Sequence, residues 1–184
     1  MVTIFDKIKR YLFWKLRGEV PTEYLQKLGL KVGYNFQRQF GCTIDISHCW
    51  LITIGNNVTL APNVHILAHD ASTKNFLGYT KIGLVSIGNN VFIGAKTIIL
   101  PNVHIGNNVI IGAGSVVTRS IPDNCLVTGN PAKVIGSVED YIDKNMKLLK
   151  TNPKYEDKWK INSITDSQKE QMKHELQNGI GYIK

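Results

Sequence analysis

The sequence of 184 residues has no long apolar run, since no stretch approaches the roughly 20 apolar residues that cross a bilayer. Its first residues also lack the uninterrupted apolar stretch and the small-residue cleavage site of a secretory signal. Cysteine is scarce: Cys42, Cys49 and Cys125 are odd in number and follow no metal-ligand spacing. We therefore expect free thiols in a reducing cytoplasm, either in solution or peripherally at the inner face of the membrane.

The composition is that of one folded domain with small appendages. Hydrophobic residues make up 43% of the chain and charged residues 20%, which excludes wholesale disorder. The net charge is +8, yet no basic block is interleaved with aromatic residues, so we expect no nucleic-acid partner. A phosphate-rich small molecule, an acidic membrane surface and ordinary solvated lysines all remain compatible with this charge.

Residues 1–30 are expected to form an N-terminal helical segment, with a second short helix after Pro21. Basic residues separate the apolar ones, as in an amphipathic helix. Such a helix either packs against its own protein or a sister subunit, or lies on anionic lipid, and the sequence leaves both open. The apolar positions at helical spacing are Ile4, Phe5, Ile8, Tyr11, Leu12 and Leu16.

From about Lys31 to Val134 the pattern changes to a period of six residues. In register the chain reads IGNNVF, IGAKTI, ILPNVH, IGNNVI and IGAGSV, preceded by IGNNVT, LAPNVH and ILAHDA. The opening aliphatic positions are Ile54, Leu60, Ile66, Ile87, Ile93, Ile99, Ile105, Ile111 and Val117, with Ile44 and Ile46 in a rougher version before them. A second apolar position follows four residues later, at Val58, Val64, Val91, Val103 and Val109.

This period fits neither a helix nor a simple hairpin. The two apolar positions of each repeat have the same parity, as one face of a strand requires. Glycine and asparagine between them tolerate the backbone angles of tight corners. The repeat therefore predicts a mainly β fold over residues 31–136, a parallel β-solenoid whose coils are about 4.8 Å apart around a narrow aliphatic interior.

The repeat fails once, in the stretch HILAHDASTKNFLGYTK, and we expect an extruded loop at residues 70–84. Residues 137–184 return to helical patterning and are expected to form a C-terminal helical extension. Ser163 or Thr165 is the expected cap of its last helix.

The register [LIV]-G-x-x-[VT]-x, the motif IGAGSVV and the closing TGNPAKVIG together resemble the hexapeptide-repeat acyltransferases. Repeat, interruption and closing motif occur in order over roughly residues 31–136, and the chain looks closest to the galactoside, maltose and polysaccharide O-acetyltransferases. The resemblance implies a left-handed parallel β-helix, a homotrimer with active sites between neighbouring subunits, and acetyl-CoA as the acyl donor.

His69 lies where the repeat breaks, after LAPNVHILA, and the resemblance implies that it is the general base. Imidazole suits this role because its unperturbed pKa lies near working pH. The group that orients His69 is left open, because Asp70 is its neighbour on an extended strand and faces the other way. Asp45 and His48 are the candidates for contacting the acceptor.

The resemblance places the donor in a groove between adjacent β-helices. Small residues at coil corners let the pantetheine arm approach the backbone, and cations meet the phosphates. The matching positions are Ala95, Ala113, Thr118, Arg119 and Lys133.

The leading hypothesis is an acetyl-CoA-dependent O-acetyltransferase acting on a saccharide hydroxyl, as in capsule or surface polysaccharide synthesis, with no metal. N-acetylation of an amino sugar or another small amine is the nearer alternative, because an amine also needs a base. A zinc carbonic anhydrase built on His65, His69 and His104, and a non-catalytic scaffold, are the further alternatives.

Overall fold

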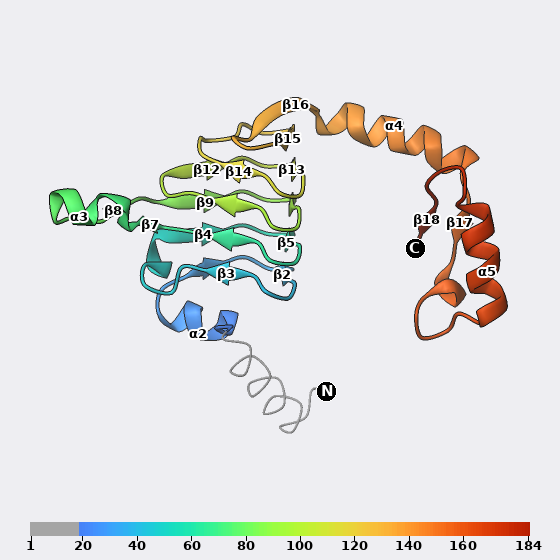
Figure 1. Cartoon of the computed structure of the whole chain (residues 1–184), viewed down its shortest axis with the longest axis horizontal. Helices are drawn as coiled ribbons and strands as arrows, with labels where there is room; N and C mark the ends of the chain where they lie inside the picture. Colours follow the sequence, from blue (N-terminus) through green and yellow to red (C-terminus); the bar gives the residue numbers. More distant parts are fainter. Residues whose placement is uncertain (1–18) are drawn as a thin grey trace, which may run out of the picture. The chain divides into compact units, whose positions relative to one another are not determined.

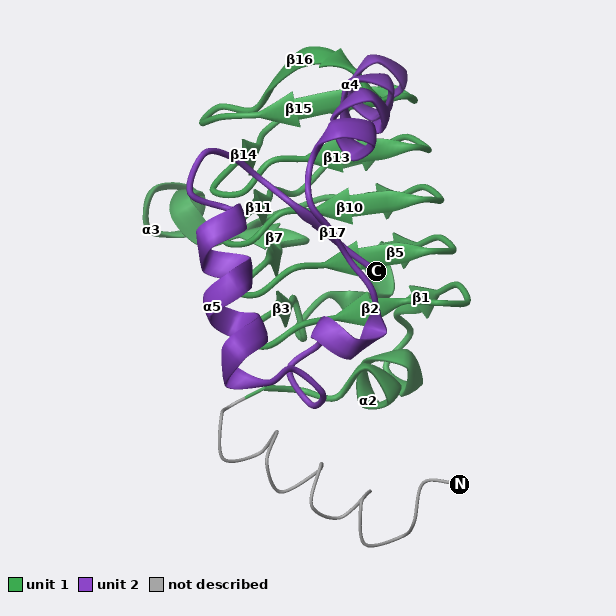
Figure 2. Ribbon diagram, turned by 90° about the vertical axis from the view of Figure 1, so that its right-hand side faces the viewer, with its two compact units in different colours: residues 1–138 green, residues 139–184 purple. Residues whose placement is uncertain are grey.

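The computed structural model describes residues 19–184, so the first predicted helix, which falls before them, lies outside the described part of the chain. The chain divides into two compact units, one ending at Val138 and one covering Glu139–Lys184 (Figure 2). The short helix expected after Pro21 is present as α2 (Thr22–Lys27). No helix among the described residues is both long and apolar enough to cross a membrane.

The first unit is a three-sided parallel β-helix, whose stacked coils are visible in Figure 1. One sheet contains β1 (Lys31–Val32), β4 (Ile52–Ile54), β9 (Val85–Ile87) and β12 (Val103–Ile105). The second contains β2 (Gln37–Arg38), β5 (Val58–Leu60), β10 (Val91–Ile93), β13 (Val109–Ile111), β15 (Cys125–Thr128) and the antiparallel β16 (Lys133–Ser137). The third contains β3 (Thr43–Ile44), β6 (His65–Ile66), β11 (Ile98–Ile99) and β14 (Val116–Val117). Because the chain visits the three sheets in turn, each complete coil adds one strand to every sheet, and β15 and β16 then extend the second sheet alone.

The predicted aliphatic positions fill the interior. Every opening residue from Ile54 to Val117 and every second apolar residue from Val58 to Val109 is at most 3% exposed. In the rougher first coil Ile44 is buried, whereas Ile46 is 44% exposed and does not belong to the core. Full burial of one such side chain contributes roughly 1.5–3 kcal/mol, so the stack of aliphatic layers is the main source of stability.

One corner of the coils carries a ladder of asparagines in the left-handed conformation, with φ between +53° and +60°. Each side-chain amide except that of the last member, Asn124, donates a hydrogen bond of 2.9–3.0 Å to the amide oxygen one coil further along. Asparagine suits this corner because it tolerates positive φ and its side chain is both donor and acceptor. The members of the ladder are Asn35, Asn57, Asn90, Asn108 and Asn124.

Glycine precedes this ladder where two coils approach most closely. A Cβ added to Gly55 would lie 2.5 Å from the carbonyl oxygen of Gly88, the equivalent residue of the next coil. The same approach recurs between Gly88 and Gly106. In the repeat, the isoleucine is therefore buried, the glycine lets the next coil approach its backbone, and an asparagine turns the corner.

The interruption of the repeat adds residues without disturbing the stack. Val58 pairs with Val91, 33 positions later, whereas Val91 pairs with Val109, 18 positions later. The additional residues of the longer coil lie between β6 and β9. They form β7 (His69–Asp70), η2 (Ala71–Thr73), α3 (Lys74–Leu77) and β8 (Lys81–Ile82), and β7 pairs antiparallel with β8.

The second unit contains α4 (Val138–Thr151), β17 (Lys154–Tyr155), η3 (Asp157–Trp159), α5 (Asp166–Glu175) and β18 (Tyr182–Ile183). Thr165 caps α5 in a reciprocal arrangement with Gln168, which confirms one of the two predicted caps. Tyr155 is buried, stacks on the Trp159 ring at 4.9 Å and donates a hydrogen bond to Glu175.

Replacing Asn90 by alanine is expected to lower the free energy of unfolding by about 2–3 kcal/mol. Alanine strains the left-handed corner by about 1–2 kcal/mol, and the bonds to Asn57 and Asn108 are lost. Asn90→Gly is the matched control, because glycine adopts the corner freely and loses only the hydrogen bonds. Urea unfolding of both variants measures the difference, and equal losses would contradict a role for the left-handed conformation.

Candidate active site

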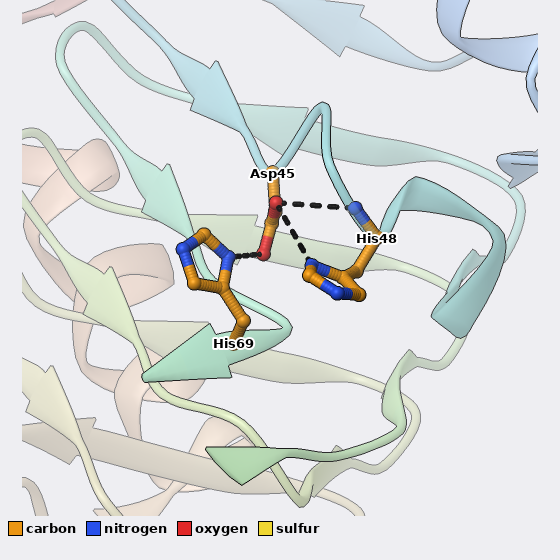
Figure 3. Close-up of side chains that lie close together, drawn as sticks. All are labelled: Asp45, His48 and His69. Carbon is orange, nitrogen blue, oxygen red and sulfur yellow. Dashed lines mark hydrogen bonds and ion pairs between the residues drawn. The ribbon is translucent and has the colours of Figure 1, made fainter. Parts of the chain in front are cut away.

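His69 begins the inserted segment, three residues after the last buried isoleucine of β6. Its side chain is 35% exposed, and its Nδ1 lies 2.5 Å from Oδ2 of Asp45 (Figure 3). The sequence left the partner of His69 open and assigned Asp45 to the acceptor. The structure instead brings the Asp45 carboxylate against the imidazole.

Asp45 is 4% exposed and lies just after β3. Its Oδ1 accepts hydrogen bonds from the backbone N–H groups of Ser47 at 3.0 Å and His48 at 3.3 Å. Its Oδ2 accepts from the backbone N–H of Ala68 at 3.0 Å as well as facing His69. A buried carboxylate with these partners is held in one orientation.

This arrangement selects one tautomer of His69. An ionised carboxylate only accepts hydrogen bonds, so the ring nitrogen that faces Asp45 carries the hydrogen. The other ring nitrogen, Nε2, then has its lone pair available to take a proton. A histidine held in this way by a buried carboxylate is the arrangement of a general base.

His48, the other predicted acceptor residue, lies beside this pair (Figure 3). The His48 and His69 ring centroids are 5.1 Å apart. The Nδ1 of His48 lies 3.9 Å from Oδ1 of Asp45, which is too far for a hydrogen bond, and it has no hydrogen-bond partner within the described residues. The His48 ring therefore borders the site at ion-pair distance from the carboxylate, without a hydrogen bond to it.

Asp70 does not orient His69, as the alternation of neighbouring strand residues predicts. Its carboxylate pairs with Lys81 at 2.6 Å and accepts a hydrogen bond from the backbone N–H of Ser72 at 2.8 Å. The hydrogen bond from Lys81, followed by that from Ser72, lowers the pKa of Asp70 well below its usual range. These contacts close the base of the inserted segment, where β7 and β8 pair.

Among the described residues, one group has side chains that could hold a metal ion. Its members are Asp45, His48 and His69, whose ligand atoms lie within 4.8 Å of one another. Two ligands of one zinc ion, each about 2 Å from the metal, would be farther apart than the 2.5 Å between Asp45 and His69. The spacing is that of a hydrogen bond, and it favours proton transfer over metal binding.

The zinc alternative required His65, His69 and His104 to meet. Within the described residues these three do not form a ligand group. His65 lies on β6 with its neighbour Ile66 buried, and His104 pairs through its Nδ1 with the Ser86 hydroxyl at 2.6 Å. Within a single chain, the three histidines of the zinc alternative are therefore not brought together.

Two of the predicted donor residues lie together at one corner of the β-helix. Ala95 and Ala113 occupy equivalent places in consecutive coils, and the backbone N–H of Gly114 bonds to the Ala95 carbonyl at 2.8 Å. The methyl side chains of both alanines are small, so a ligand can approach the backbone there. The two alanines therefore form a corner of the β-helix with little side-chain bulk.

The other donor candidates do not contact these alanines in any described hydrogen bond or ion pair. Thr118 and Arg119 follow β14 and are exposed. Lys133 begins β16, where it pairs with Thr128, and is also exposed. In the part of the chain that the structure describes, neither Arg119 nor Lys133 forms an ion pair, so both cations are available to a bound anion.

Comparison with known proteins identifies relatives of this chain. The family model described as "Bacterial transferase hexapeptide (six repeats)" matches residues 85–119. Protein CapG of Staphylococcus aureus is 43% identical over 144 residues, which cover 72% of this chain and 81% of that protein.

Two solved structures are similar over the coils. A maltose O-acetyltransferase from Clostridium difficile 630 shares 43% identity with a TM-score of 0.51, over 59% of this chain and 59% of that chain. A galactoside acetyltransferase in complex with coenzyme A shares 30% identity with a TM-score of 0.56, over 73% of this chain and 80% of that chain.

Removing the Asp45 carboxylate is expected to destabilise the fold as well as the site. Asp45→Ala leaves the N–H groups of Ser47 and the buried Ala68 without acceptors, and we expect a loss of about 3 kcal/mol in unfolding free energy. Asp45→Asn keeps an acceptor oxygen and is expected to lose about half as much. Urea denaturation compares the two, and an alanine variant as stable as the wild type would contradict the assigned bonds.

Proposed function

Because the chain belongs to the hexapeptide-repeat acyltransferase family, we propose that it transfers the acetyl group of acetyl-CoA to a hydroxyl of a saccharide, with His69 as general base. The β-helix of this family is left-handed. The observation that carries the proposal is the contact between His69 and the buried Asp45.

The proposed reaction uses the free nitrogen of His69. Nε2 removes the proton from the acceptor hydroxyl as its oxygen attacks the thioester carbonyl, and the carbon–sulfur bond breaks when the tetrahedral intermediate collapses. The imidazolium then returns the proton to the departing thiolate. Asp45 holds the ring and stabilises the imidazolium through both stages.

The proposed donor site begins at the corner formed by Ala95 and Ala113. The absence of larger side chains there lets the pantetheine arm lie along backbone groups. Thr118, Arg119 and Lys133 would then meet the phosphate end, since guanidinium and ammonium groups bind phosphate through charge-assisted hydrogen bonds. The coenzyme A complex of a relative supports a donor of this class.

The proposed acceptor is a saccharide, as in capsule or surface polysaccharide synthesis. The support is that solved relatives are named for maltose and galactoside. His48 borders the proposed hydroxyl position and remains a candidate contact. N-acetylation of an amino sugar is the second candidate, because the same base would accept a proton from an attacking amine.

We further propose a homotrimer with the active site between subunits. The inserted segment exposes Phe76, Leu77 and Tyr79 by 66–87%, and such an apolar projection suits burial against a neighbouring subunit. The described thiols are free, which suits the proposed cytoplasmic location. Membrane contact is a prediction for the first helix, which lies outside the described part of the chain.

A thiol-release assay tests the proposed function. Purified protein is incubated with acetyl-CoA and a panel of sugars, amino sugars and lipid-linked saccharides, and the product is identified by mass spectrometry. Acetyl esters on a saccharide support O-acetylation, amides support the second candidate, and release from no member of the panel would overturn both.

Replacing His69 by alanine is expected to lower turnover by about 100-fold or more while the protein stays folded, because the proton acceptor is lost. His65→Ala is the matched control, since His65 lies on the same turn of chain outside the proposed chemistry, and its turnover is expected within about twofold of wild type. Steady-state rates and thermal melts of both variants give the comparison. Near-normal turnover of the His69 variant would remove it from the mechanism.

Arg119→Ala and Lys133→Ala are each expected to raise the KM for acetyl-CoA by about tenfold with little change in turnover, since each loses a cation near phosphate. Lys74→Ala, in the inserted segment, serves as the control for simple loss of charge. An unchanged donor KM in both variants would show that the phosphates bind elsewhere.

A further inference from the structure

Trp50 lies next to the proposed active site and has no part in the chemistry described above. Its ring centroid is 5.4 Å from that of His48, and the His48 ring is in turn 5.1 Å from that of His69. The indole is therefore one ring away from the general base. A molecule bound at His69 that reached past His48 would meet the Trp50 ring.

Trp50 is exposed although its backbone is firmly held. It occupies η1 (Cys49–Leu51), where Cys49 is fully buried and the N–H of Leu51 bonds to the His48 carbonyl at 2.9 Å. On the other side Gly29, with φ of +108°, leaves no room for a Cβ, because that atom would lie 2.8 Å from the Trp50 Cβ. Trp50 is nevertheless 55% exposed.

An exposed indole on a firmly held backbone is unfavourable in the free protein, since a large apolar surface faces water. The same features are favourable for binding, because little conformational freedom is lost when a ligand covers the ring. Because Trp50 lies beside the His48 and His69 pair, we expect the proposed acceptor to cover its ring.

We propose that Trp50 is the acceptor platform of this enzyme, on which a pyranose ring lies with its C–H face against the indole. This inference rests on the proposed function and narrows the acceptor from any saccharide to one with a pyranose ring. The hydroxyl groups at the rim of such a ring remain free to reach His48 and His69. An open-chain polyol offers hydroxyls of the same kind but no flat apolar face to the indole.

The experiment compares two acceptors on wild type, Trp50→Ala and Trp50→Phe. One acceptor is the pyranoside of the panel that the wild type acetylates fastest, and the other is the open-chain alditol of the same sugar. Trp159→Ala is the matched control, because it removes the same side chain from the second unit. Acetyl-CoA hydrolysis without an acceptor, size-exclusion chromatography and thermal melts are recorded for every variant.

Trp50→Ala is expected to raise the KM for the pyranoside by about tenfold or more with little change in turnover, as loss of an apolar contact requires. Trp50→Phe is expected to recover part of this loss. The KM for the alditol, the KM for acetyl-CoA and the hydrolysis without acceptor are expected to stay within about twofold of wild type.

Several results would overturn the platform. The proposal is wrong if Trp50→Ala leaves the KM for the pyranoside unchanged. It is also wrong if the KM values for the pyranoside and the alditol change equally. A matching fall in acceptor-free hydrolysis would indicate that Trp50 positions His48 or His69, and dissociation of the oligomer would indicate a subunit contact. If wild type acetylates no saccharide, the proposed function fails and the platform with it; if wild type acetylates a saccharide independently of Trp50, only the platform fails.

Discussion

The corner that every coil must turn is the constraint on which the rest of this structure depends. Three short strands enclose an aliphatic interior only if the chain changes direction sharply between them, and one such corner is turned by an asparagine with positive φ. Because the coils stack in register, equivalent asparagines meet and bond to one another along the corner. The same residue therefore shapes each coil and joins it to the next.

The site uses this rigidity at a point where the repeat is irregular. Thr43 pairs with His65 across a longer coil than the one that joins Val91 to Val109, so the chain after β3 contains a turn that the regular coils lack. Asp45 lies in that turn and holds it through the backbone N–H groups of Ser47 and His48. Its second oxygen holds Ala68 and faces His69. The Asp45 carboxylate thus holds two irregular segments of backbone together and also orients the imidazole of His69, the candidate base.

The period of six predicted the interior because burial in a solenoid depends on a local property, the place of a residue within its repeat. It also located the insertion, since an interruption is visible against a regular background. The pairing of Asp45 with His69 was not predicted, because it joins residues 24 positions apart across the coil of irregular length. Counting on from the stacked pair Ile44 and Ile66 places Asp45 beside Leu67, two residues before His69. The place of Trp50 beside the site could not be predicted from the sequence, because an isolated aromatic residue in an irregular segment belongs to no pattern.

The inserted segment leaves the stack through one pair of short strands and returns to the same register. Its residues make no contribution to the aliphatic layers, and its base is closed locally by Asp70 and Lys81. The β-helix is consequently a fixed framework, and the insertion is a separate segment attached to it. The length and composition of the insertion beyond β7 can therefore change, during evolution or by design, without repacking the core.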